Sequence, residues 1–273
     1  MTIVCEIVKE VETMNQIVRL QKEVWGTDAV TSMPQMIAAV HHGGVVIAAF
    51  DDGKVVGFCY GFPGVKDGAA YIVSHMMAIH PDYRDSGLGQ RLKELQRSWA
   101  LASGYDKVVW TFDPLETRNA NLNLNKLGGT AKVYIENYYG ELDDPSNGSM
   151  PTDRFLVEWE LRSPRCENAI SGKTPDVPRW STYASLFDWE LEGEFPRPVA
   201  ASSGPTSDAC LVPVPKAIRD MKTKNPELAK LWRFELRRQL TRSLADGYCV
   251  VGLWRTEQPV HYYVLEHAER FVR

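Results

Sequence analysis

The chain has 273 residues, of which 44% are hydrophobic and 24% are charged, and these values exclude a disordered or fibrous protein. A chain of this length buries enough apolar surface for one large domain or for a domain with an appendage. The formal net charge of -4 argues against broad electrostatic binding to nucleic acid or to an anionic membrane, because such binding needs clustered basic charge.

The sequence also sets expectations for metal binding and for the compartment. Its 5 cysteines are odd in number and form no Cys-x-x-Cys pair, so they indicate reduced thiols rather than disulfides or a zinc site. Charged residues near the N-terminus interrupt any signal peptide, and no apolar run approaches the length of a membrane span. We therefore expect a cytoplasmic protein without a metal.

The first elements in chain order are short strands and amphipathic helices. Ser32 and Gln35 have the spacing of a capping box, which predicts a helix start. Apolar periodicity and turn residues predict the rest. The predicted elements are a strand at 2–8, a helix at 11–25, a helix from 32 to about 42, and two hairpin strands at 45–50 and 54–62.

Residues 74–92 are the most informative stretch. They read SHMMAIHPDYRDSGLGQRL, which is an apolar strand ending at Ile79, a turn, a glycine loop and the start of a helix. The spacing Arg84-x-x-Gly87-x-Gly89 places glycines where backbone N–H groups can surround a bulky anion, and the helix N-terminus adds to the attraction. The stretch therefore predicts a site for a phosphate-bearing ligand.

A dinucleotide-binding turn is the alternative at this loop. Gly87-x-Gly89 opens a helix, and Asp113 ends the next predicted strand at a suggestive distance. Leu92, however, stands in the place of a third glycine, and residues 80–86 separate the strand from the loop. Both departures count against this alternative.

At these residues the chain resembles the GNAT superfamily of acyl-CoA-dependent N-acyltransferases, whose pyrophosphate loop has the pattern Gln/Arg-x-x-Gly-x-Gly/Ala. The run from 77 to 84, with the pattern Met-Ala-Ile-His-Pro-x-x-Arg, is similar to that family's strand end and turn. The resemblance implies that acetyl-CoA, or another acyl-CoA, is the co-substrate. It implies that the pantetheine arm pairs with the backbone of Met77, Ala78 and Ile79, and that the pyrophosphate is held by Arg84, Asp85, Ser86, Gly87, Leu88, Gly89 and Gln90.

The elements that follow complete the order of the GNAT fold. They are a strand at 107–112, a helix from about 119 to 127 closed by Gly128 and Gly129, and strands at 131–137 and 155–161. The resemblance implies an α/β (α+β) fold with a mixed, mostly antiparallel sheet flanked by helices. We assign this acyltransferase core to residues 1–162.

Residues 163–273 are expected to form a C-terminal α+β extension packed on the core. Prolines should break any long regular element over 163–215. Asn225 and Pro226 predict a helix start, with the basic residues of that helix on a solvated face. The helix is expected to reach about 245, and two strands follow at 248–254 and 261–265.

Acyl transfer to an amine needs stabilisation of the charge on the thioester oxygen and removal of a proton. The resemblance assigns the first task to a backbone amide where the strand leaves its neighbour, here that of Met77. Deprotonating a lysine-type amine at pH 7 costs about 4–5 kcal/mol, so a base would help. His75, expected on the same strand face as Met77, corresponds to a catalytic histidine of some members. The alternative is a strand histidine with no role in proton transfer.

The proton donor to the departing CoA thiolate is where the chain departs from the family pattern. Leu124 stands where many members have a tyrosine. Either a nearby tyrosine serves, with Tyr138 as our candidate beside Tyr134 and Tyr139, or the thiolate leaves without an acid. Aromatic packing is the alternative for these tyrosines. Asn119 lies off the family spacing and is expected to bond the pantetheine or to cap its helix.

The acceptor is predicted to bind near the polar loop 140–153. Arg118 and Arg154, with Tyr139 beside them, are our candidates for holding a substrate carboxylate through paired N–H groups. The alternative for both arginines is ordinary surface ion pairing, with Asp153 as one candidate partner.

Together these features predict an N-acyltransferase that moves an acetyl group, or a larger one such as succinyl, from acyl-CoA to the amine of a small metabolite, for example an amino acid. A module that binds or senses acyl-CoA without turnover is one alternative, and a protein lysine acetyltransferase is another. No nucleic acid or membrane partner is expected, and the oligomeric state stays open, a homodimer included.

Overall fold

The structure is a computed structural model that describes residues 3–26, 30–140, 150–199 and 208–271. The chain divides into two compact units. Unit 1 comprises Met1–Trp110 and Trp159–Glu167, and unit 2 comprises Thr111–Glu158 and Asn168–Arg273. The predicted core of 1–162 and extension of 163–273 stay a prediction, because a family domain and a compact unit need not share their boundaries. Of the helices described, none is long and apolar enough to cross a membrane.

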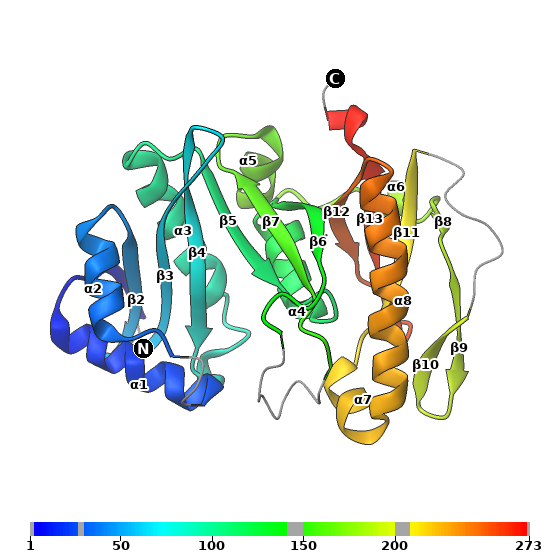
Figure 1. The fold of residues 1–273 in the computed structure, drawn as a ribbon, viewed down its shortest axis with the longest axis horizontal. Helices are drawn as coiled ribbons and strands as arrows, with labels where there is room; N and C mark the ends of the chain where they lie inside the picture. Colours follow the sequence, from blue (N-terminus) through cyan, green and yellow to red (C-terminus); the bar gives the residue numbers. More distant parts are fainter. Residues whose placement is uncertain (1–2, 27–29, 141–149, 200–207, 272–273) are drawn as a thin grey trace. The chain divides into compact units, whose positions relative to one another are not determined.

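Unit 1 is a strand layer with helices on both of its faces (Figure 1). Its strands follow the order β1-β2-β3-β4-β5; neighbours are antiparallel except β4 and β5, which are parallel. Helices α1 and α2 pack on one face and α3 packs on the other. The elements are β1 (Val4–Ile7), α1 (Val11–Trp25), α2 (Met33–His41), β2 (Val45–Asp51), β3 (Lys54–Lys66), β4 (Ala69–Ile79), η1 (Pro81–Tyr83), α3 (Leu88–Ala102) and β5 (Lys107–Phe112).

The helices of unit 1 begin where the sequence predicts. Met14, Ile17 and Leu20 form one buried stripe on α1, which holds the helix against the strands. The Ser32 hydroxyl accepts a hydrogen bond from the Gln35 backbone N–H at 3.4 Å, so the predicted cap of α2 is confirmed.

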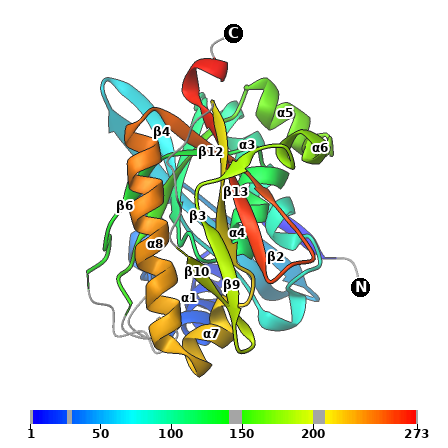
Figure 2. The same ribbon diagram turned by 90° about the vertical axis from the view of Figure 1, so that its right-hand side faces the viewer.

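Unit 2 has its own strands, in the order β7-β6-β12-β13-β11-β8, and a separate β9–β10 hairpin. Its strand pairs are antiparallel except β8 and β11, and the long helix α8 packs on β6, β10, β11 and β12 (Figure 2). The elements that begin after residue 111 are α4 (Thr117–Ala120), η2 (Asn121–Lys126), β6 (Thr130–Ile135), β7 (Arg154–Glu160), α5 (Pro164–Ile170), α6 (Val177–Trp180), β8 (Ala184–Ser185), β9 (Asp188–Glu192), β10 (Phe195–Val199), β11 (Ala209–Pro215), α7 (Ile218–Lys224), α8 (Pro226–Ala245), β12 (Tyr248–Trp254), β13 (Val260–His267) and η3 (Ala268–Phe271).

The predicted fold class is confirmed, since both units are mixed α/β with mostly antiparallel strands flanked by helices. The proline-rich region nevertheless contains a buried strand, β11, which includes Pro213 and Pro215. β11 pairs with β13 along its whole length but with β8 only at Cys210 and Leu211. The prolines lie where β11 pairs with β13 alone, so the N–H groups that they lack would have had no second strand to bind.

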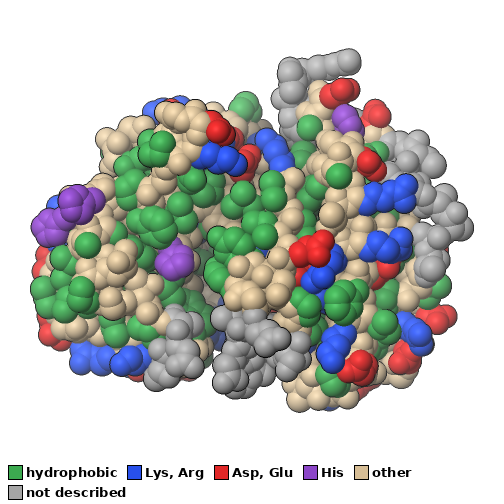
Figure 3. All heavy atoms as spheres, in the orientation of Figure 1, with side chains coloured by type: hydrophobic (Ala, Val, Ile, Leu, Met, Phe, Trp, Pro, Cys, Tyr) green, Lys and Arg blue, Asp and Glu red, His purple; other side chains and the backbone are tan. Residues whose placement is uncertain are grey.

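Helix α8 begins at its predicted cap, because the Asn225 side chain accepts a hydrogen bond from the Leu228 N–H at 3.2 Å. The expected solvated face for its basic residues is only partly right. Both acidic and basic side chains lie on the side of the molecule that includes α8 (Figure 3), but the Arg233 side chain is 0% exposed and Arg237 is largely buried. Both arginines pair with buried carboxylates, which offset the cost of removing their charges from water.

Candidate functional site

The loop 84–89 presents backbone N–H groups at the start of α3. Asp85 and Gly87 have positive φ angles of 62° and 82°. Gly87 occupies the N-cap position, where no side-chain hydrogen bond caps the first turn, and the described first turn of α3 holds no acidic residue. Uncapped N–H groups and the helix dipole favour an anion at this end. The loop therefore fits a diphosphate group such as that of CoA.

The other polar side chains of the loop bond to the protein itself. Arg84 Nε donates to the Ile79 carbonyl at 3.2 Å, while Ser86 Oγ donates to a carbonyl of the preceding turn at 2.6 Å. Gln90 Nε2 donates within α3 at 2.8 Å, and Leu88 is buried against the strands. Backbone N–H groups, and the guanidinium nitrogens of Arg84 other than Nε, are thus the donors that suit an anion here.

Strand β4 runs beside β5 for only part of its length. Within the described residues, the pairing with β5 ends at Val73. Backbone groups point alternately to the two sides of a strand, and the His80 N–H donates to the Val56 carbonyl of β3 at 2.9 Å. By this alternation the Met77 N–H points away from β3, toward the edge of β4 that no longer pairs with β5.

Two further residues of β4 complete this edge. Ile79 points its backbone groups to the same side as Met77, and its carbonyl accepts from Arg84. Ala78 alternates with them, so its backbone groups face β3, where it pairs with Phe58. The open edge therefore carries backbone groups of Met77 and Ile79, which suits an extended ligand with amides of its own.

His75 lies in a β-bulge, and the bulge overturns its expected position. Ser74 and Met76 of β4 pair with successive residues of β3, which makes His75 the extra residue. One extra residue reverses the alternation of side chains between the two faces. The His75 ring lies 6.1 Å from that of Tyr60, on the face covered by α1 and α2, whereas Met77 packs on the α3 face. The prediction that His75 and Met77 share a face is therefore wrong.

The environment of His75 suits a proton acceptor. Its side chain is exposed at one edge and packed at the other, with ring centroids 6.1 Å from Tyr60 and 5.7 Å from Phe62. This partial burial lowers the pKa of His75 below its ordinary value. The imidazole is consequently neutral at pH 7 and has a lone pair available.

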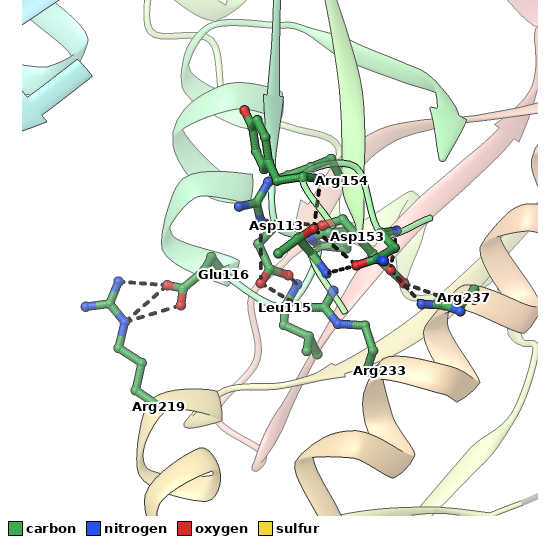
Figure 4. A network of polar contacts seen from close by, with 12 residues as sticks. Asp113, Leu115, Glu116, Asp153, Arg154, Arg219, Arg233 and Arg237 are labelled. Carbon is green, nitrogen blue, oxygen red and sulfur yellow. Dashed lines mark hydrogen bonds and ion pairs between the residues drawn. The ribbon is translucent and has the colours of Figure 1, made fainter. Parts of the chain in front are cut away.

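Unit 2 contains a buried network of arginines and carboxylates (Figure 4). Arg233 Nη2 donates to Asp113 Oδ2 at 2.7 Å, and the Leu115 N–H donates to Asp113 Oδ1 at 2.8 Å. Burial alone would raise the pKa of Asp113, but Arg233 outweighs it and holds that pKa below its ordinary value. Arg233 Nε and Nη1 are buried and find no hydrogen-bond partner among the described residues. Asp113 thus binds an arginine. The dinucleotide-binding alternative, in which this carboxylate would contact a ribose, is not needed to explain it.

The second buried carboxylate of the network is Asp153. Arg237 donates to it through Nε at 2.9 Å and Nη2 at 2.7 Å, and the Tyr134 hydroxyl donates at 2.6 Å. Burial, and next the negative charge of Asp153, raise the pKa of Tyr134. The Tyr134 proton is therefore held tightly, which makes this residue a poor proton donor.

Arg154 and Tyr139, two residues of the predicted acceptor site, lie close together. The Arg154 guanidinium is 5.2 Å from the Tyr139 ring centroid, and its Nη1 is 3.8 Å from Asp113 Oδ2. Arg154 does form an ion pair, as the alternative holds, but its partner is Asp113; from Asp153 it contacts only the backbone carbonyl, at 3.5 Å. Tyr138 and Tyr139 are 48% and 45% exposed and stack edge to face. Residues 141–149 of the predicted acceptor loop lie outside the described residues.

Arg118 and Asn119 are exposed residues of α4. Arg118 lines a cavity of about 240 Å³ together with Glu116, Lys216 and Arg219, apart from Arg154 and Tyr139. The next turn, η2, is a π-helix, which the sequence did not reveal. A π-helical turn uses more residues than an α-turn, so α-helical spacing is a poor guide to this segment. Leu124 is fully buried there and fills space in the core.

Sequence reasoning missed the most unusual charged residue of unit 1, the buried Lys93 of α3, which is 2% exposed. One stripe of α3 carries small residues, a glycine and an alanine, and a lysine stands on the same stripe, at positions 89, 93, 96 and 100. This lysine on a packed stripe was the available signal. Among the described residues, no group of His, Cys, Asp and Glu is arranged to hold a metal.

The sequence model of the acetyltransferase (GNAT) family matches residues 11–128. No curated protein matches the chain. Similar solved structures include the putative acetyltransferase yncA of Salmonella typhimurium with acetyl-CoA, at 15% identity over 60% of this chain and 96% of that one, with a TM-score of 0.49. An N-acetyltransferase of Staphylococcus aureus Mu50 has 16% identity over 59% and 100%, with a TM-score of 0.49. The ribosomal-protein-S18-alanine N-acetyltransferase of Escherichia coli has 16% identity over 59% and 96%, with a TM-score of 0.48.

Proposed function

Residues 11–128 form an acetyltransferase domain of the GNAT family, and from this premise we propose that the protein transfers an acyl group from acyl-CoA to the amine of a small metabolite. Acyl-CoA supplies an activated thioester when it is bound, and CoA leaves as the thiol after transfer to the amine. The acyl group is acetyl or a larger one such as succinyl, and the acceptor is an amine that also carries a carboxylate, for example an amino acid.

The observation that carries this proposal is the combination of the loop 84–89 with the open edge of β4. N–H groups at the start of α3 hold the diphosphate, since they are uncapped and lie at a helix N-terminus. The backbone of Met77 and Ile79 pairs with the pantetheine arm. The Met77 N–H meets the thioester oxygen, where a donor fixed in advance lowers the barrier to acyl transfer.

His75 is the proposed general base. Its lowered pKa keeps the imidazole neutral at pH 7, so it can take a proton from the acceptor amine directly or through water. Its place on the α1–α2 face means that the amine approaches from the face opposite to that of the Met77 side chain. The backbone amide of Met77 points along the plane of the sheet, so its position does not depend on which face carries the Met77 side chain.

On the acceptor side, Arg154 and Tyr139 are proposed to bind the substrate carboxylate. The guanidinium is 3.8 Å from Asp113, a separation longer than a hydrogen bond, so its N–H groups keep donor capacity for a ligand. Arg118 is proposed as a second carboxylate contact and Asn119 as a pantetheine contact. Tyr138 is the proposed proton donor to the thiolate, because Tyr134 is committed to Asp153.

A thiol-release assay tests the proposal. Purified protein is incubated with acetyl-CoA or succinyl-CoA and a panel of amino acids and other amines. We expect free thiol to appear with at least one acceptor and to be accompanied by an acylated product of the matching mass. Absence of thiol release with every pair would contradict the proposal, and tight CoA binding without turnover would favour a sensing module. Acylated lysines on a partner protein, with no small-molecule product, would favour a protein acetyltransferase.

The role of His75 is tested in the same assay with His75→Ala. Loss of a general base typically lowers the rate by about 10²–10⁴-fold, and the loss should be largest for acceptors with high amine pKa. His41→Ala is the matched control, since His41 is an exposed histidine of α2. Equal rates for the two variants would show that His75 transfers no proton.

A further inference from the structure

The ammonium group of Lys93 lies inside unit 1 among polar and aromatic partners. Lys93 Nζ donates to Ser74 Oγ at 2.7 Å and to Gln96 Oε1 at 3.1 Å, and it lies 3.8 Å from the centroid of the Trp110 ring. Ser74 Oγ in turn lies 3.6 Å from the sulfur of Cys59. A buried amine is costly unless it is satisfied, and this one has two hydrogen bonds and a cation–π contact.

These partners mark the place where β4 and β5 separate. The last paired row of the two strands joins Val73 to Val109, so the next row in the same register would join Ser74 to Trp110. Lys93 contacts both residues of that row from α3. Lys93 therefore bridges β4 and β5 at the first row where the two strands no longer pair, a place that we call the fork.

The same row adjoins the bulge of β4. Ser74 is the residue directly before the extra residue His75, and it pairs with Gly61 of β3. A Cβ on Gly61 would lie 3.0 Å from the Val73 carbonyl oxygen and 3.1 Å from Gln96 Nε2. The packing around Ser74 is thus tight on the β3 side and is held by Lys93 on the α3 side.

We propose that Lys93 is a positioning residue of the acyl-transfer site. Its ammonium holds Ser74 and Trp110 at the fork, and these contacts fix the bulge of β4 and the open β4 edge that carries the Met77 amide. This inference rests on the proposed function of that edge. Lys93 does not touch the reacting atoms; it acts through Ser74, which directly precedes His75 and lies three residues before Met77.

The charge of Lys93 is responsive to pH. Burial lowers its pKa to about 8, and the nearby Cys59 thiol opposes that shift. The other contacts of the ammonium, Ser74, Gln96 and Trp110, are uncharged. On α3 itself, the carboxylate of Glu94 accepts from Gln90, and Arg97, which has the same charge as Lys93, donates to a backbone carbonyl. Above pH 8 the cation–π contact is lost, and the hold on the fork weakens.

The first experiment measures kcat/KM for acyl transfer from pH 6.5 to 9.5. Wild type is expected to lose activity above about pH 8. Lys93→Met should be tenfold to a hundredfold slower at pH 7 and should lack this inflection. Purely structural damage would lower the rate by one factor at every pH and would leave the profile parallel to wild type. Lys107→Met is the matched control, because Lys107 is a partly exposed lysine of β5 paired with Glu160.

The second experiment needs no activity. Amide hydrogen exchange of the protein without ligand is compared at Met76 and Ala78, whose N–H groups face β3. Lys93→Met should raise exchange there at least tenfold over Lys107→Met. If wild type releases no thiol with any acyl-CoA, the proposed function fails and this exchange result alone decides the role of Lys93.

Ser74→Ala covers the case in which Lys93→Met does not fold. It removes the link to β4 and leaves the ammonium, so it should reproduce both the lost inflection and the faster exchange. A pH profile parallel to wild type together with unchanged exchange at β4, in whichever of the two variants folds, would overturn the inference.

Discussion

Arginine–carboxylate pairs in unit 2 differ in how far the arginine is buried. Asp113 is the anion of a pair in which Arg233 is 0% exposed, whereas Glu116 pairs with Arg219, whose side chain is 67% exposed (Figure 4). Removing one partner of a buried pair leaves an uncompensated charge in a medium of low polarity. Removing one partner of an exposed pair lets water take over.

We predict that Asp113→Asn lowers the free energy of unfolding by about 3–5 kcal/mol, because Arg233 loses its counter-charge. The asparagine amide keeps an oxygen that accepts from the Leu115 N–H. The lost free energy of unfolding therefore reflects the missing negative charge rather than a broken turn. Glu116→Gln is the control and should cost about 0–1 kcal/mol. Urea unfolding followed by circular dichroism measures both. Equal losses in the two variants would show that burial of Arg233 does not depend on Asp113.

At the scale of elements, α3 joins the proposed phosphate loop to the strand layer. A glycine in the left-handed region stands at each end, Gly87 with φ 82° and Gly104 with φ 83°, and a Cβ at either position would meet nothing within 4 Å. The two glycines are therefore matched in backbone strain and in space. Only Gly87 belongs to the loop that faces the proposed ligand.

Gly87→Ala and Gly104→Ala should each lower the free energy of unfolding by about 1–2 kcal/mol, since an alanine in this region is strained. Only Gly87→Ala should weaken CoA binding, by tenfold or more, because the strained backbone turns its N–H groups away from the diphosphate. Calorimetric titration with CoA measures the affinity. The same affinity in both variants would mean that the loop does not bind the diphosphate.

Elements with a strong local signal could be predicted from the sequence, and elements that depend on distant partners could not. α1 and α8 begin and end close to their predicted residues, because an apolar stripe and an Asn225 cap are local features. The π-helix η2 and the strand β11 were missed. Prolines argue against a strand locally, and only the one-sided pairing of β11 with β13 makes them acceptable.

The same distinction applies to the candidate site. The loop 84–89 and the Met77 edge follow from a contiguous motif. The bulge at His75 does not, since nothing in the β4 sequence shows that β3 pairs out of step with it. The pairing of Arg233 with Asp113 joins residues 120 positions apart, so helical periodicity alone assigned Arg233 to a solvated face.

At the scale of the whole molecule, the chain consists of two α/β units, and the stretch that matches the GNAT family model, residues 11–128, includes residues of both. The donor residues of the proposed reaction, from Met77 to Gln90, belong to unit 1. The residues proposed for the acceptor carboxylate, among them Arg154 and Tyr139, belong to unit 2.

The most direct test is a crystal structure of the protein with acetyl-CoA. We predict that the diphosphate lies against the N–H groups at the start of α3, that the pantetheine pairs with β4, and that the thioester oxygen accepts a hydrogen bond from the Met77 amide. Acetyl-CoA bound elsewhere, or a β4 edge closed by β5 in the complex, would contradict it.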